Sequence, residues 1–454
     1  MERNAILRGG RQLVESLQRA DGGRILRLQI ALFLFSLAVF LTARVVQVSD
    51  SRYTAMLSEC LLHHRSAELD EYYKVPVPWR TGDAGLPEEA NEYQLVKARG
   101  HVTYFFGHGS SILSIPLVAA MNAWGVSAAT ADGRLDLGGE FRIERAIASV
   151  LMAGLTCVFL AMALKMIPVS WSVVVALGAS MGSQILSTAS RGLWAHTWEI
   201  VILGLIAQSL LSAEHRGTRL RAIWLATLVA WSYWVRPTGA IAIVAVSIYV
   251  LWVHREDFVA YAVTLVGWLA AFAGYSWSVF GTMIPPYYSA SRLGSNNVPL
   301  ALAVSLISPS RGLFIFVPTT LFVLYLVARY RKHLAHRRIA VLALAQIIAF
   351  AIVICMNGSW TEGWCYGPRY FTDAIPWFVL LAILGLDAMR RAPVASNHRI
   401  EIAAAIVLVA VSVAINARGA WSYAGLDWNP VEHHGAFNWR YPQFMAGLIE
   451  PPKD

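Results

Sequence analysis

The chain has 454 residues, of which 57% are hydrophobic and only 14% are charged, and its mean hydropathy is +0.51. Soluble domains carry roughly 25% charged residues, so this composition excludes an ordinary water-soluble protein. The formal net charge of +9 comes from short basic clusters between apolar runs, which is typical of membrane loops, and nucleic-acid binding is therefore not expected.

Apolar runs long enough to cross a bilayer recur along almost the whole chain. Because backbone polar groups in lipid must be satisfied internally, these runs predict an all-α integral membrane protein with about eleven transmembrane helices. No room is left for a large soluble domain, so residues 1–454 are interpreted as a single polytopic membrane domain. The expected spans are 28–48, 143–166, 170–188, 194–213, 219–235, 238–254, 258–280, 312–329, 338–356, 372–390 and 400–417.

Lysine and arginine predict the orientation, because short cytoplasmic loops are enriched in both. Basic clusters precede the first span and follow the fourth, eighth and tenth, and this alternation places all of them on one side. We therefore expect residues 1–28 to be a cytoplasmic amphipathic N-terminus and the first span to be a permanent signal-anchor. The tail 418–454 is expected on the outer side.

The first outer loop, residues 49–142, is the largest connection. It contains DSRYTAMLSECLLHH, which is amphipathic at helical spacing, and an apolar run at 110–124 that is short for a span. We expect these two stretches to form helices in the membrane interface. The second outer loop, 281–311, contains PPYYSASRLGSNN and SPSRG, and a third contains GWCYGPRY.

Five arginines lie at the outer ends of the spans beside turn-forming or aromatic residues. Arginine binds phosphate with a planar bidentate fork, so the group predicts a site for a lipid phosphate. Arg369 is the strongest candidate, because Gly367 and Pro368 fix the turn that presents it. Two alternatives stay open: each arginine can snorkel or pair structurally, and Asp373 can be the salt-bridge partner of Arg369. The five candidates are Arg191, Arg236, Arg292, Arg311 and Arg369.

Asp50 follows the first span in QVSDSRY and is the candidate catalytic base, since a carboxylate held at a rigid helix end can deprotonate a hydroxyl nucleophile. Its alternative role is to cap a helix at 51–63. Asp70 and Glu71 are a second candidate pair, or a solvated turn. The candidates for contacts with sugar hydroxyls or phosphate are His108, His196, Tyr366, Tyr370 and Asp373. For the outer aromatics in general, an interfacial belt is the alternative.

Cys60 and Cys365 fall in outer loops, where either a disulfide or two separate thiols is consistent with the pattern. No Cys/His spacing predicts a metal site, and no cofactor is expected, although a divalent cation remains an open alternative.

Together these stretches resemble the GT-C superfamily of polytopic glycosyltransferases, and more narrowly the family 39-like bacterial enzymes similar to dolichyl-phosphate-mannose-protein mannosyltransferases. The likeness covers most of the chain, in short motifs. It rests on DSRYT at 50–54, GHVTYFFGHG at 100–109, SRGLWAHTW at 190–198, WVRPTG at 234–239, SPSRGL at 308–313 and GPRY at 367–370.

The resemblance implies a membrane enzyme with its active site in the periplasm. It implies a polyprenyl-phosphate-linked sugar as donor and a hydroxyl acceptor on a glycan, lipid or protein. It also implies location in a bacterial inner membrane, with a cytoplasmic N-terminus and a periplasmic C-terminus. The catalytic aspartate of that family matches Asp50. Many relatives have a second acid at the next position, where this chain has Ser51, which lowers the expectation of a bound metal.

Two other classes of function compete with the glycosyltransferase. A transporter or flippase of a lipid-linked or anionic solute would also place arginines in a cavity, but such proteins tend to contain inverted repeats, and none is evident. A transferase of phosphoglycerol or acyl groups would need a nucleophile or a metal cluster, which the sequence does not suggest.

Overall fold

The computed structural model describes residues 2–72, 93–294, 297–358, 361–393 and 398–451. Within these residues the protein is predominantly helical, and strands β1 (Leu95–Ala98) and β2 (His101–Tyr104) form an antiparallel hairpin. Seven helices of the described part are long and apolar enough to cross a membrane, and further apolar helices are shorter. This is the architecture of an all-α multi-pass membrane protein, as the sequence predicts.

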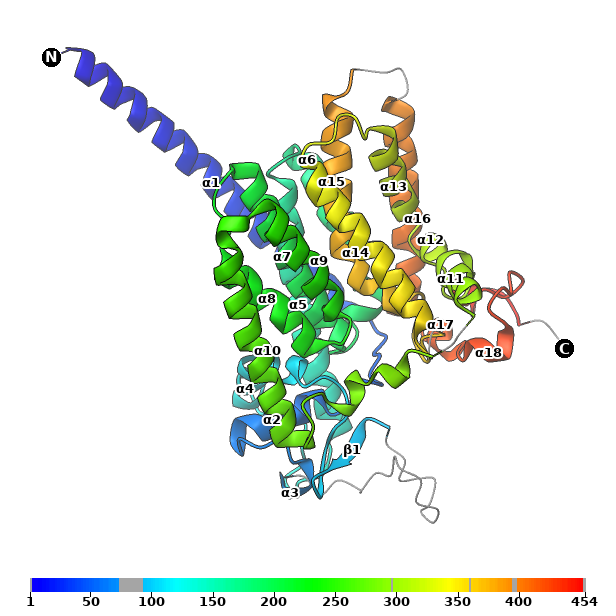
Figure 1. Cartoon of the computed structure of the whole chain (residues 1–454). Coiled ribbons are helices and arrows are strands. Elements are labelled where there is room, and N and C mark those ends of the chain that lie inside the picture. Colours follow the sequence, from blue (N-terminus) through cyan, green and yellow to red (C-terminus); the bar gives the residue numbers. More distant parts are fainter. Residues whose placement is uncertain (1, 73–92, 295–296, 359–360, 394–397, 452–454) are drawn as a thin grey trace.

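The long helices lie side by side in a bundle, and α1 extends beyond it (Figure 1). The elements of the first loop gather at one end of this bundle, opposite the end where α15 passes into α16 (Figure 1). The long apolar helices are α1 (Glu2–Thr42), α5 (Leu137–Ala163), α7 (Ala195–Arg216), α10 (Phe258–Phe280), α14 (Arg337–Met356), α15 (Ile375–Arg391) and α16 (His398–Trp421).

Among the shorter helices, α8 (Ala222–Val235) and α9 (Gly239–Val253) match predicted spans closely, whereas α6 (Val169–Met181) covers only the first part of the span expected at 170–188. Helix α11 (Val298–Ile307) lies in the second outer loop and was not predicted from the sequence. The remaining short elements are α2 (Thr54–His63), α3 (Leu69–Tyr72), α4 (Gly109–Ala123), α12 (Leu313–Phe316), α13 (Thr319–Arg329), α17 (Ala424–Asp427) and α18 (Val431–His434).

Two predicted spans are interrupted. At both interruptions the side chain of Asn416 in α16 forms a hydrogen bond with the broken segment. The span expected at 312–329 is divided at Pro318 into α12 and α13, and Asn416 Nδ2 donates to the carbonyl of Phe316 at 2.9 Å. The span expected at 170–188 ends at Met181 and continues as a π-helical turn, in which Ser187 donates to Asn416 Oδ1 at 2.8 Å. A broken helix in a membrane needs such partners, because its exposed carbonyls cannot reach water.

The first span ends at Thr42 instead of residue 48, because the next segment is held as extended chain by tertiary hydrogen bonds. The amide of Val45 donates to the Ala420 carbonyl at 3.0 Å, and that of Gln47 donates to the Arg191 carbonyl at 3.1 Å. Apolarity does not distinguish a buried extended segment from a helix, which explains the difference. The extended segment leads directly to Asp50.

The first loop has its own hydrophobic core, built from α2, α4, the hairpin and the start of α5. Residues Thr54–Cys60 of α2 are buried, so this helix packs inside the loop domain instead of lying on a lipid surface as an isolated interfacial helix. The carboxylate of Glu140 accepts from the amides of Ala55 and Met56 at 3.0 and 3.1 Å, which satisfies the first turn of α2. The loop is thereby fixed to α5.

Candidate functional site

A cavity of about 820 Å³ lies between the first loop and the loop that precedes α15. Its wall contains both charged and aromatic side chains. The residues that matter for its chemistry are Asp50, Tyr93, Arg292, Trp364, Arg369 and Tyr370.

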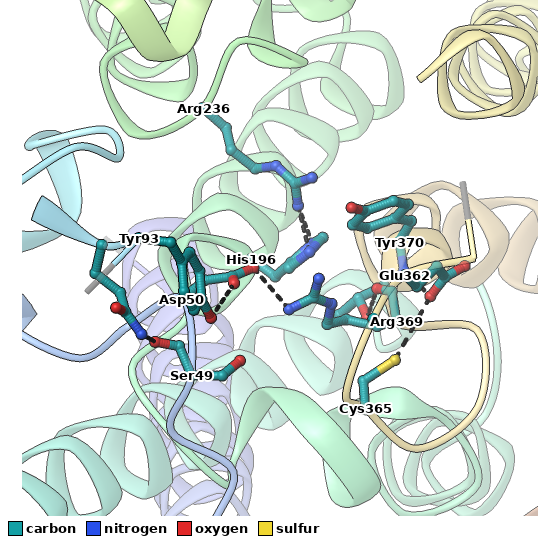
Figure 2. A network of polar contacts seen from close by, with 12 residues as sticks. Ser49, Asp50, Tyr93, His196, Arg236, Glu362, Cys365, Arg369 and Tyr370 are labelled. Atoms are coloured by element: carbon teal, nitrogen blue, oxygen red, sulfur yellow. Dashed lines mark hydrogen bonds and ion pairs between the residues drawn. The ribbon is translucent and has the colours of Figure 1, made fainter. Parts of the chain in front are cut away.

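Asp50 and Arg369 form an ion pair in the wall of this cavity, with Arg369 Nη1 at 2.9 Å from Asp50 Oδ2 (Figure 2). The Arg369 side chain is only 5% exposed, whereas the Asp50 side chain is 32% exposed. The guanidinium also lies 4.4 Å from the centre of the Trp194 ring, a cation–π contact. The pair therefore presents its carboxylate to solvent and keeps its cation inside.

The second carboxylate oxygen of Asp50 accepts a hydrogen bond from the Tyr93 hydroxyl at 2.9 Å. Burial, together with the negative charge of Asp50, raises the pKa of Tyr93, so the phenol remains a donor. Asp50 does not cap α2, because Glu140 accepts from the first amides of that helix. The structure therefore assigns the capping role, which the sequence left open for Asp50, to a different acid.

The turn that presents Arg369 is fixed by close packing and by three hydrogen bonds. Gly367 has φ +66°, and a Cβ there would lie 2.7 Å from the Phe316 ring, so only glycine fits. Its amide donates to Gln443 Oε1 at 2.9 Å, and Gln443 Nε2 donates to the Cys365 carbonyl at 2.9 Å. On the other side of the turn, the amide of Tyr370 donates to Glu362 Oε2 at 2.9 Å.

Behind this pair lies a buried cluster of His196, Arg236 and Asp373. His196 Nδ1 is 2.8 Å from Asp373 Oδ1, and Arg236 Nη1 is 3.1 Å from Asp373 Oδ2. Arg236 also contacts the imidazole directly (Figure 2). Asp373 is thus the partner of Arg236 and His196, and the alternative in which it pairs with Arg369 is not the arrangement found.

Tyr370 separates the two clusters. The guanidinium of Arg236 lies 5.7 Å from the centre of the Tyr370 ring, and that of Arg369 lies 5.2 Å from the same centre. Tyr370 also lines the cavity. The buried cluster is therefore adjacent to the cavity without opening into it.

Arg292 lines the cavity from the second outer loop, with its guanidinium 4.5 Å from the centre of the Tyr287 ring. It forms no ion pair with any residue that the structure describes, and it is half-buried. A partly desolvated arginine with no counter-charge favours an anionic ligand.

Arg191 and Arg311 lie outside the cavity and bind backbone carbonyls. Arg191 donates to the carbonyls of Phe40 and Ala43, where α1 ends, and this basic side chain complements the negative end of the helix dipole. Arg311 donates to the carbonyls of Thr361, Ser310 and Gly363 at 3.0, 3.0 and 2.9 Å. Of the five arginines that were expected to converge, Arg292 and Arg369 line the cavity, and Arg236 lies behind Tyr370.

His108 and Tyr366 are also packing residues in this structure. The two ring nitrogens of His108 lie 2.8 Å from the Tyr275 hydroxyl and 2.8 Å from the Tyr104 carbonyl. Burial lowers the pKa of His108 to about 4, so the ring is neutral at physiological pH. The Tyr366 hydroxyl donates to the Ile415 carbonyl at 2.8 Å. Neither side chain lines the cavity, so the interpretation of these two as sugar-binding residues does not fit.

Asp70, the second candidate acid, holds the hairpin of the first loop. Its Oδ1 accepts from the Val102 amide at 2.9 Å, and its Oδ2 lies 3.3 Å from His101 Nδ1. The side chain of Glu71 lies outside the described part of the structure. Asp70 is not among the described residues that line the cavity.

Glu362 is a residue of the cavity wall that the sequence analysis did not select. It is fully buried, and burial raises its pKa to about 7 against the opposing charges of Arg311 and Arg369. The sequence signal was present, because an acidic residue occurs seven positions before Arg369 in the same loop. Tyr93, in contrast, follows a long polar stretch with no motif that marks it.

Cys60 and Cys365 are not joined by a disulfide. The Cys60 thiol lies 3.6 Å from the Glu68 carbonyl, and the Cys365 thiol lies 3.6 Å from the Gly367 carbonyl. Among the residues that the structure describes, no group of three or more histidine, cysteine, aspartate or glutamate side chains is arranged to hold a metal ion.

No protein-family model matches this chain, and no curated protein matches it either. A proposal about function therefore rests on the resemblance in the short motifs and on the geometry of the cavity.

Proposed function

We propose that this protein is a membrane glycosyltransferase of the GT-C type. It transfers a sugar from a polyprenyl-phosphate-linked donor to a hydroxyl acceptor on the periplasmic side, by an inverting single displacement. The acceptor is a glycan, lipid or protein, and neither a cofactor nor nucleic acid takes part. The observation that carries the proposal is the Asp50–Arg369 pair in the cavity wall, which combines an accessible carboxylate with a buried cation.

In the proposed reaction, Asp50 accepts the proton of the acceptor hydroxyl while the hydroxyl oxygen attacks the anomeric carbon. The bond between that carbon and the phosphate oxygen breaks, and its electron pair leaves with the polyprenyl phosphate. Because the phosphate is already a good leaving group, the protein chiefly has to neutralise charge, orient the hydroxyl and remove one proton. Arg369 and Arg292 supply the positive charge.

Donor binding would also change the state of the base. Asp50 Oδ2 is neutralised by Arg369 at 2.9 Å, and a phosphate that binds Arg369 would compete for the same guanidinium. The carboxylate would then keep the Tyr93 hydrogen bond at 2.9 Å and have its other oxygen free to accept the proton of the acceptor hydroxyl. Such an exchange would couple donor binding to activation of the acceptor.

The proposal places eleven spans across a bacterial inner membrane, with the N-terminus in the cytoplasm and the C-terminus in the periplasm. Seven of these spans correspond to the long apolar helices of the described residues. The other four spans correspond to α6, α8, α9 and the α12–α13 pair, which are short or broken and border buried polar residues. Impermeant labelling of single cysteines placed after α4 and between α15 and α16 would test the two sides.

The proposed function is tested with purified protein in nanodiscs that contain membrane lipids. A panel of polyprenyl-phosphate sugars is supplied with and without cell-envelope glycan or lipid acceptors, and released polyprenyl phosphate is measured. Release that requires an acceptor supports a transferase. Movement of an unaltered donor between leaflets would instead support the flippase alternative, and release without any acceptor would indicate a hydrolase.

A further inference from the structure

A much smaller chamber, with a volume of about 10 Å³, is lined by Asp373 and shares no lining residue with the main cavity. A space of roughly 10–15 Å³ is enough for one water-sized occupant. Four helical elements surround it: α7 provides Glu199, the start of α9 provides Thr238, α14 provides Gln346, and the turn before α15 provides Asp373. The remaining lining is apolar.

The polar side chains around this chamber have atoms without hydrogen-bond partners among the described residues. These atoms are Glu199 Oε2, Thr238 Oγ1 and Gln346 Nε2, and Glu199 and Gln346 are only 1% and 3% exposed. The other Glu199 oxygen accepts from the Ser232 hydroxyl at 2.6 Å, so only one side of the carboxylate is satisfied. Buried polar atoms that converge on a common space indicate a ligand in that space.

The buried cluster contains two carboxyl groups, Glu199 and Asp373, but only one guanidinium, that of Arg236. Asp373 is compensated by Arg236 at 3.1 Å, and His196 accepts from Arg236 at one ring nitrogen and is therefore neutral. Glu199 forms no ion pair with any residue that the structure describes, so in its ionised form it would be the one uncompensated charge of the cluster. A single positive charge would neutralise the cluster, whereas a divalent ion would leave an excess of positive charge next to Arg236.

We propose that this chamber binds one small monovalent cation, sodium, between Glu199, Asp373, Thr238 and Gln346. Carboxylate, hydroxyl and amide oxygens are the hard ligands that such a cation prefers, and the amide of Gln346 offers its oxygen by a simple rotation about its last bond. The ion would hold Asp373 in place, and Asp373 in turn holds Arg236 behind Tyr370. This proposal does not depend on the proposed glycosyltransferase activity.

The test measures binding of radioactive sodium to the full-length protein in nanodiscs at alkaline pH, together with thermal unfolding in sodium chloride and in choline chloride of equal ionic strength. We expect one sodium ion per protein, and unfolding midpoints that rise with sodium and reach a plateau. Glu199→Gln and Thr238→Val should each weaken sodium binding at least about tenfold. Glu214→Gln is the matched control, because it alters an acid on the same helix that lies outside the chamber.

Three results would overturn the proposal. One is the absence of sodium binding to the wild-type protein, with equal midpoints in sodium and choline. The second is wild-type sodium affinity in Thr238→Val. This variant removes only a hydroxyl and keeps the shape of the side chain, so it still tests the site if Glu199→Gln does not fold. An infrared band from a protonated buried carboxyl that persists in sodium and disappears in Glu199→Gln would show that a proton occupies the site instead.

Discussion

Asp50 and Arg369 are 319 positions apart in the chain, yet Oδ2 of the first lies 2.9 Å from Nη1 of the second. The aspartate follows the first long helix and the arginine precedes α15, so the pair joins the N-terminal and C-terminal parts of the chain. Because the cation is buried and the acid is one-third exposed, an anion that enters the cavity meets Asp50 before it reaches Arg369.

Replacement of the acid should separate catalysis from folding. Asp50→Asn is expected to lower the transfer rate by about 10²–10⁴-fold, since a general base typically contributes that much. Binding of polyprenyl phosphate should not weaken, because the neutral amide no longer competes with the phosphate for Arg369. Transfer is measured as acceptor-dependent release of polyprenyl phosphate. Asp132→Asn is the control, because it changes an exposed acid of the same loop. Activity within about threefold of wild type would remove Asp50 from the role of base.

Replacement of the buried cation should weaken binding of the donor. Arg369→Ala is expected to cost about 2–4 kcal/mol of donor affinity, which is typical for loss of one partner of a desolvated charge pair. Arg369→Lys should recover only part of this affinity, because lysine lacks the planar fork. Affinity for polyprenyl phosphate is measured by microscale thermophoresis in nanodiscs, and equal affinity in wild type and Arg369→Ala would assign this arginine to structure.

The opposite pattern is expected for Arg311, which is fully buried and binds several carbonyl and amide oxygens. Arg311→Ala should lower the free energy of unfolding by about 3 kcal/mol or more, because its acceptors would be left without partners. Unfolding in mixtures of detergent and sodium dodecyl sulfate measures the change. Arg331→Ala, on the exposed connection before α14, is the control. Wild-type stability of Arg311→Ala would show that water replaces its contacts.

Glu362 should make stability depend on pH. Burial raises its pKa to about 7 from the ordinary 4.5, so the folded protein holds this proton more tightly than the unfolded chain does. Stability is then greatest below pH 4.5, falls as the pH rises to about 7, and is level above it. The loss is on the order of 3 kcal/mol. Unfolding curves across this range should therefore be flatter for Glu362→Gln than for wild type, and Glu256→Gln serves as an exposed control.

The state of the four cysteines can be read directly by thiol labelling. Cys60 and Cys365 are fully buried and not cross-linked, so an impermeant maleimide should label neither in the folded protein, with or without reductant. After denaturation without reductant, all four thiols should react. Mass spectrometry counts the labels, and two labels that appear only after reduction would reveal a disulfide.

The spans were predictable because a run of about twenty apolar residues has few alternatives to a membrane helix. Helix α10 matches the expected 258–280 at both ends. The predictions differ from the structure where apolar residues serve another purpose, as in the segment after Thr42, which is extended and bound to Ala420 and Arg191. The hairpin of the first loop was not predicted, because its four-residue strands are too short to show a clear alternation.

The site was predictable only in its components. Asp50 and Arg369 were selected by their positions at helix ends, but which charges pair depends on tertiary packing that no local pattern encodes. The motif Ser-Arg-Gly-Leu could have told more, because it occurs twice, at 190–193 and 310–313. In both copies the arginine binds backbone carbonyls, and a Cβ on the glycine would lie within 2.4 Å of a carbonyl oxygen.

The extended segment that carries Asp50 has a consequence for biogenesis. Its amides bind Arg191 and Ala420, and the acid at its end binds Arg369, so its partners are made at widely separated times during translation. A nascent chain that has not yet emerged past α16 lacks the Ala420 carbonyl that aligns this segment, even when Arg369 has already been made. If the protein is the proposed glycosyltransferase, a ribosome-bound intermediate would not cleave donor lipids. Catalytic activity would begin only when the last helix has entered the bilayer.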